Sequence, residues 1–153
     1  MAIYSLRKLG GAITPDTTSV TYLSMIPAAT RSIRIQEVSS SGLGTASAAN
    51  EFRMTPAPAG SVPGGALTPF PLSPLGQVAA GFTTATTYTT APALPAQGGI
   101  AYGVNANGGT YRWLAKTNFE LISMSGITNN ATMGWAVVSG TSSCAGHVIV
   151  EEL

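Results

Sequence analysis

Charge is scarce in this sequence: Asp, Glu, Lys and Arg make up only 8% of its 153 residues, against roughly 25% in an average soluble protein. Seven basic and six acidic side chains give a formal net charge of +1, and Arg7–Lys8 is the only adjacent basic pair. Because electrostatic capture of nucleic acid requires a concentrated basic face, no nucleic-acid partner is expected. A surface with so little charge suits a molecule that is packed against others.

Groups that could perform catalysis or hold a metal are also few: one cysteine, Cys144, one histidine, His147, and one aspartate, Asp16, beside five glutamates. A zinc site usually draws on three or four ligands, and Cys144 and His147 supply two. A Ser-His-Asp arrangement lacks the G-x-S-x-G elbow that would present its serine. We therefore expect no catalytic site, no metal and no cofactor, and a protein that is not an enzyme.

Long apolar runs are missing as well. No stretch reaches the ~18 uninterrupted apolar residues of a membrane helix. The start of the chain, MAIYSLRKLGG, lacks the long apolar region of a secretory signal. The sequence predicts a protein that is made in the cytosol and has no membrane partner.

Strand signals, in contrast, are plentiful, while few windows reach the 3.6-residue periodicity of a helix. Segments rich in β-branched and aromatic residues predict nine strands. They are Ala2–Arg7, Ser19–Ile26, Ser32–Ser39, Asn50–Met54, Thr83–Thr90, Thr110–Lys116, Asn118–Ser125, Met133–Ser139 and His147–Glu151. Short strands punctuated by Gly, Pro and Asn predict a single all-β domain over 1–153, an antiparallel β-sandwich of jelly-roll type, with a closed barrel as the alternative.

A proline-rich segment, Thr55–Gln77, interrupts this rhythm and holds six of the ten prolines. Proline removes a ladder donor, so the segment is not expected to be a central strand. A polyproline-like stretch and a long ordered loop both fit. Its side chains Leu67, Phe70, Leu72 and Leu75 would be costly to leave in water. We expect an arm that lies on its own sandwich or on a neighbouring molecule.

Glu37 is predicted to form an ion pair that fixes strand register. Within its strand it shares a face with Ile33 and Ile35, so it needs a cation on an adjacent strand. The candidates are Arg53, Arg112 and Lys116, and Arg112 is preferred. The weaker alternative is a glycosidase-like carboxylate pair of Glu37 with Glu120.

Aromatic residues leave one further alternative open. Trp135 lies in an apolar run, GWAVV, and is expected in the core. Trp113, beside Arg112, would be available for stacking on a sugar ring if it were exposed.

Four segments together resemble small virion structural proteins of tailed bacteriophages. These are MAIYSLR at the N-terminus, ATRSIRIQEVSSSGLGTASAANEFRMTPAPAG, TTAPALPAQGG, and a C-terminal GWAVVSG…HVIVEEL in which the last strand ends in acidic residues. The sequence departs from that pattern after the middle proline run, where it reads GGIAYGVN in place of a segment containing two arginines.

The resemblance implies a capsid decoration, or cement, protein with a β-sandwich fold, assembled in the host cytoplasm and seated on the capsid surface of the virion. Its expected partners are the major capsid protein and further copies of itself, as a dimer or trimer. Expected contact residues come from the arm and from the N-terminal strand: Pro56, Pro58, Phe70, Pro71 and Leu72, and Ile3, Tyr4 and Leu6. The competing hypothesis is a receptor- or glycan-binding module of a phage fibre or tail.

Overall fold

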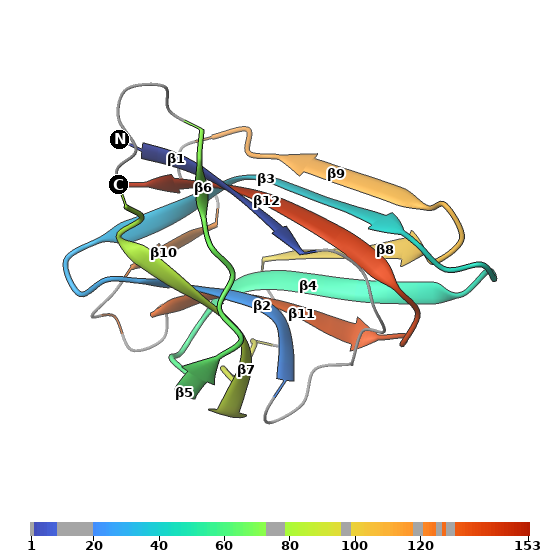
Figure 1. The fold of residues 1–153 in the computed structure, drawn as a ribbon, viewed down its shortest axis with the longest axis horizontal. Coiled ribbons are helices and arrows are strands. Elements are labelled where there is room, and N and C mark those ends of the chain that lie inside the picture. Colours follow the sequence, from blue (N-terminus) through green and yellow to red (C-terminus); the bar gives the residue numbers. More distant parts are fainter. Residues whose placement is uncertain are drawn as a thin grey trace.

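The chain folds into two antiparallel β-sheets packed face to face, which confirms the predicted all-β sandwich (Figure 1). The computed structural model describes residues 2–8, 20–72, 79–95, 99–117, 121–124, 127 and 131–153. Every secondary-structure element in these ranges is a strand. Leucine, valine and aromatic side chains from both sheets meet between the layers, as sandwich packing requires.

One sheet, sheet A, has the strand order β10-β3-β12-β1-β6, and β9 lies beside β10 along the same edge of β3. Its strands are β1 (Ala2–Lys8), β3 (Ser32–Gly42), β6 (Phe70–Pro71), β9 (Thr110–Leu114), β10 (Ile122–Met124) and β12 (Cys144–Glu152). The N-terminal strand β1 thus pairs with the C-terminal strand β12, and the two ends of the chain lie at the same end of the molecule (Figure 1).

The other sheet, sheet B, has the order β5-β7-β2-β11-β4-β8. Its strands are β2 (Val20–Pro27), β4 (Ala49–Ala57), β5 (Ser61–Gly64), β7 (Phe82–Thr90), β8 (Ile100–Asn105) and β11 (Thr132–Ser139). Each of the nine predicted strands overlaps a strand of the structure. Part of the predicted strand Asn118–Ser125 lies outside the described residues, and three strands, β5, β6 and β8, were not predicted.

An aromatic cluster forms the centre of the core. The Trp135 ring packs edge-on against Tyr22, with ring centroids 4.7 Å apart, and Tyr22 packs in the same way against Phe52 at 5.2 Å. Gly146 of β12 faces this cluster, because a Cβ atom there would lie 2.5 Å from Trp135 Cη2 and 2.8 Å from Tyr22 Cε1. A glycine at this position lets sheet A approach the tryptophan closely.

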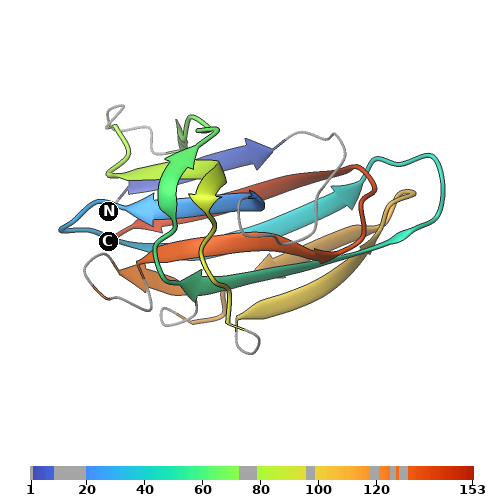
Figure 2. The same cartoon turned by 90° about the horizontal axis from the view of Figure 1, so that it is seen from below.

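The proline-rich segment closes one side of the sandwich. After β4 it forms β5, which pairs with β7 at one edge of sheet B, and then β6, which pairs with β1 at one edge of sheet A (Figure 2). Between them, the backbone N–H and C=O of Leu67 both bond to Thr84 Oγ1, at 2.6 and 2.8 Å. The described part of the arm, up to Leu72, therefore lies on its own sandwich, which was one of the two expected arrangements, and Leu75 lies outside the described residues.

The proline-rich segment was expected to lie outside the central strands, and this was wrong for Pro56. It lies inside β4, opposite Met133 of β11. The pairing of β4 with β8 ends at Met54 and Ile100. At Pro56, β4 has therefore become an edge strand, where a missing N–H breaks no ladder bond.

The segment Ala91–Pro95, which follows β7, crosses the outer face of sheet B (Figure 2). Leu94 lies directly on Gly134, where an added Cβ would be 2.4 Å from Leu94 Cδ2. Arg53 Nη1 donates a hydrogen bond to the carbonyl oxygen of Pro95 at 3.1 Å. Exposed apolar side chains gather instead on the other sheet: seven of the nine large ones among the described residues lie on strands of sheet A or directly follow them.

Candidate binding face on sheet A

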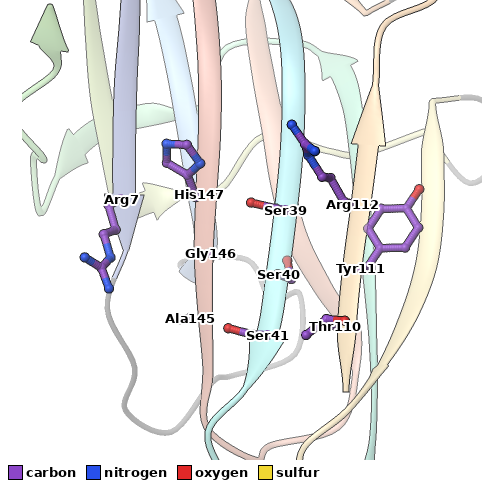
Figure 3. Close-up of a pocket in the computed structure, with 10 residues that line it drawn as sticks. All are labelled: Arg7, Ser39, Ser40, Ser41, Thr110, Tyr111, Arg112, Ala145, Gly146 and His147. Carbon is purple, nitrogen blue, oxygen red and sulfur yellow. The ribbon is translucent and has the colours of Figure 1, made fainter. Parts of the chain in front are cut away.

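A shallow polar groove crosses the outer face of sheet A (Figure 3). It has a volume of about 450 Å³ and runs over β1, β12, β3 and β9, with Arg7 at one margin and Arg112 at the other. Hydroxyl groups of Ser39, Ser41 and Thr110 lie between the two arginines, together with His147. The groove therefore offers several hydrogen-bond donors and acceptors to a partner, alongside apolar surface from its other lining residues.

Two side-chain pairs hold the floor of this groove in place. Arg112 Nε and Nη2 donate to Glu37 Oε1 and Oε2, both at 2.9 Å, so the structure brings the expected ion pair together in bidentate form. These hydrogen bonds lower the pKa of Glu37. On the neighbouring strand, Ser5 Oγ lies 2.8 Å from His147 Nε2.

The prediction that Glu37 shares a face of the sheet with Ile33 and Ile35 was wrong. Ile33 and Ile35 point into the core, but Glu37 lies on the outer face, because β3 contains a bulge at Gln36 where its register with β12 shifts. One extra residue in a strand exchanges the two faces for every residue that follows.

Ser5, His147 and Glu37 lie near one another, and a serine hydrogen-bonded to an imidazole resembles a nucleophile–base pair. Acyl transfer also requires N–H donors aimed at a developing oxyanion. In this part of the sheet β12 is paired on both sides, so its backbone N–H groups belong to the ladders with β1 and β3. The geometry is that of a rigid hydrogen-bonding surface.

The two residues considered as zinc ligands lie apart. Cys144 is buried and faces the core, where burial raises the pKa of its thiol. His147, three residues further along β12, lies on the outer face. Within the described part of the chain, no group of three or more His, Cys, Asp and Glu side chains is placed to hold a metal ion.

An apolar ridge, formed by Ile3, Phe70 and Leu72, stands on the same sheet at its β6 edge. Phe70 pairs with Ser5 across the β1–β6 ladder, and the N–H of Leu72 donates to the carbonyl of Ile3 at 2.8 Å. These side chains are 39%, 67% and 46% exposed for Ile3, Phe70 and Leu72. The structure thus brings three of the expected contact residues into one surface.

Other expected contact residues are placed differently. Tyr4 and Leu6 are only 1% exposed, so the expectation that they contact a partner was wrong. They alternate with Ile3 and Ser5 along β1, and alternation sends them into the core. Pro71 is half-buried beside the ridge, whereas Pro56 and Pro58 are half-buried in and after β4 of the other sheet.

Two arginines next to this face anchor the C-terminus. Arg34 donates from Nε to Glu151 Oε2 at 3.0 Å, and Arg34 Nη2 and Gln36 Nε2 donate to the same oxygen. Arg31 Nε pairs with Glu152 Oε1 at 3.3 Å, and Glu152 Oε2 accepts the N–H of Gly81 at 2.9 Å. Neither pair was predicted from the sequence. Their only signal was two arginines in ATRSIR and two acids at the end of HVIVEEL.

The fold and this face define a β-sandwich in which one sheet is crossed on its outer face by a segment of its own chain and the other presents an apolar ridge beside a groove. No family model matches the sequence, and no curated protein and no solved structure matches it either. A helix long and apolar enough to cross a membrane is not found among the described residues.

Proposed function

We propose that this chain is a structural protein of a bacteriophage virion: a capsid decoration protein that binds the major capsid protein non-covalently and stabilises the shell. The apolar ridge is the observation that carries the proposal. Ile3, Phe70 and Leu72 are held by backbone hydrogen bonds in exposed positions. A contiguous exposed apolar surface on a soluble domain marks an interaction site, because its burial is favourable by about 25 cal/mol per Å².

The arrangement of the face suits binding to a lattice. The ridge supplies an apolar centre, and the adjoining groove supplies hydrogen bonds at the rim, which is the usual anatomy of a protein interface. Because the ridge sits on paired strands, little ordering entropy is lost on binding. A stable contact of this kind buries about 1,000 Å² or more. Each bound copy then stabilises the assembled shell by mass action.

Phe70→Ser is expected to weaken binding of the purified chain to undecorated particles by roughly 30-fold, the effect of losing a central aromatic contact. Leu43→Ser is the matched control, because Leu43 is also exposed, at 53%, but lies in the loop after β3. Binding is measured by co-sedimentation, and electron cryomicroscopy of the particles locates the chain. Equal effects of both variants, or a chain absent from the icosahedral shell, would contradict the proposal.

A glycan-binding module of a fibre or tail is the second candidate, and the polar groove favours it. Trp113, the residue first considered for sugar stacking, faces inward opposite Val38 and lines a separate cavity with Ile100 and Leu121. A glycan would therefore contact the groove. Ser39→Val is expected to abolish glycan binding and leave particle binding unchanged if this candidate holds, as measured on a glycan array. Trp113→Ala serves as the control that should leave glycan binding intact.

A further inference from the structure

The free edges of the two sheets are not equally protected. The edge strands β5 and β6 contain Pro63 and Pro71, and β9 contains Arg112. Prolines and charges are the devices by which proteins prevent pairing at exposed strand edges. The remaining edge of sheet B is β8, with the sequence IAYGVN, which has six residues and neither a proline nor a charge.

The pairing with β4 shows which backbone groups of β8 are free. The N–H of Ala106 donates to the carbonyl of Ala48 at 2.8 Å, and this pair is directly opposed in the β4–β8 register. Hydrogen-bonded and non-hydrogen-bonded pairs alternate in an antiparallel ladder. The backbone N–H and C=O groups of Ala101, Gly103 and Asn105 therefore point away from β4. The Asn105 carbonyl already accepts the N–H of Gly109 at 3.0 Å. Among the hydrogen bonds of the described part of the chain, none occupies the backbone N–H or C=O groups of Ala101 and Gly103.

We propose that β8 pairs with β8 of a second copy of this chain, antiparallel about a two-fold axis through Tyr102. In that register Ala101 is directly opposite Gly103 of the second copy, and Gly103 is opposite its Ala101. The free N–H and C=O groups of both residues are then all bonded, as four hydrogen bonds across the axis. The side chains of Ala101 and Gly103 are small, so they do not obstruct the approach of the second β8 strand to this edge. Sheet B then continues from one copy into the other.

Charges on β4 are compatible with the same register. Arg53 lies opposite Ala101 within the chain, and Glu51 lies opposite Gly103. A two-fold axis through Tyr102 aligns Arg53 of each copy with Glu51 of the other. An axis through Gly103 instead aligns Glu51 with Glu51 and requires the Asn105 carbonyl, which is occupied. The proposal is independent of the capsid role, because the ridge lies on the other sheet, at its β6 edge (Figure 1).

Sedimentation of the purified full chain over a range of concentrations tests the dimer. Gly103→Pro removes only an N–H that faces away from β4, so the fold is retained, and dimer dissociation constants are expected to rise roughly tenfold. Phe70→Ser is the control that should leave the dimer unchanged. A chain that stays monomeric at all concentrations, or a dimer lost with Phe70→Ser but not with Gly103→Pro, would overturn the inference.

The register is tested by disulfide trapping. Chains carrying Ala101→Cys are mixed with chains carrying Gly103→Cys in oxidised glutathione. Directly opposed Cα atoms lie about 5.5 Å apart, within the range a disulfide spans. We expect a cross-linked dimer in the mixture and little in either chain alone. Cys144 is 1% exposed and should not compete. Equal cross-linking in the unmixed samples, or none in the mixture, would contradict the proposed axis.

Discussion

Replacing Arg34 by methionine is expected to lower the free energy of unfolding by about 3–5 kcal/mol, the cost of leaving a buried charge without its partner. Arg34 and Glu151 are 9% and 4% exposed. Methionine keeps much of the length of the side chain but removes the guanidinium, so Glu151 retains only the Gln36 amide among the side-chain donors described for it. The pair also joins β3 to the end of β12, so its loss loosens the C-terminal strand.

Arg31→Met is the matched control for this prediction. It removes the same kind of side chain from the same end of the molecule, but the Arg31 side chain is 55% exposed and its contact with Glu152 measures 3.3 Å. Glu152 also keeps the N–H of Gly81. Because exposed ion pairs contribute little, this variant should lose less than about 1 kcal/mol.

Urea unfolding of both variants at pH 7 measures the difference. Adding Glu151→Leu to Arg34→Met should recover much of the lost stability, since no buried charge then remains unpaired. Equal losses in Arg34→Met and Arg31→Met would show that the buried position of Arg34 contributes nothing special to stability.

Local patterns in the sequence were sufficient for the nine predicted strands, because β-branched and aromatic runs mark them directly. The three strands that were not predicted lie at sheet edges, where tertiary pairing decides. Pro63 and Pro71 argue against strands by propensity, and β8 contains Gly103 and ends at Asn105. Each becomes a strand because a neighbouring strand offers it hydrogen-bonding groups.

The candidate site was less predictable, for physical reasons that differ between residues. Tyr4 and Leu6 looked available because the N-terminal strand could have been an edge, but β1 pairs with β12 on one side and β6 on the other. A bulge of one residue at Gln36 reversed the expected face of Glu37. The Arg34–Glu151 pair joins residues 117 positions apart. No local periodicity contains such a contact.

Trp135→Ala is expected to cost about 3–5 kcal/mol of unfolding free energy, because it leaves a large cavity where both sheets meet. The indole is fully buried and contacts Tyr22 and Phe52. Trp113→Ala is the matched control, since this second tryptophan is half-buried near the edge of the sandwich. It should cost about 1–2 kcal/mol, in proportion to the smaller apolar area that it buries. Similar losses in the two variants would contradict the position of Trp135 at the centre of the core.

A further substitution tests the specific contact between Trp135 and Gly146. Gly146→Val should destabilise the otherwise unaltered chain by about 1–3 kcal/mol, because the added Cβ lies 2.5 Å from the tryptophan ring. In the Trp135→Ala background the same change should cost less, because the clash with the indole is gone and only the contact with Tyr22, at 2.8 Å, remains. The coupling is measured as the difference between the two costs in urea unfolding. Purely additive losses would mean that the indole does not set the distance between the sheets at this point.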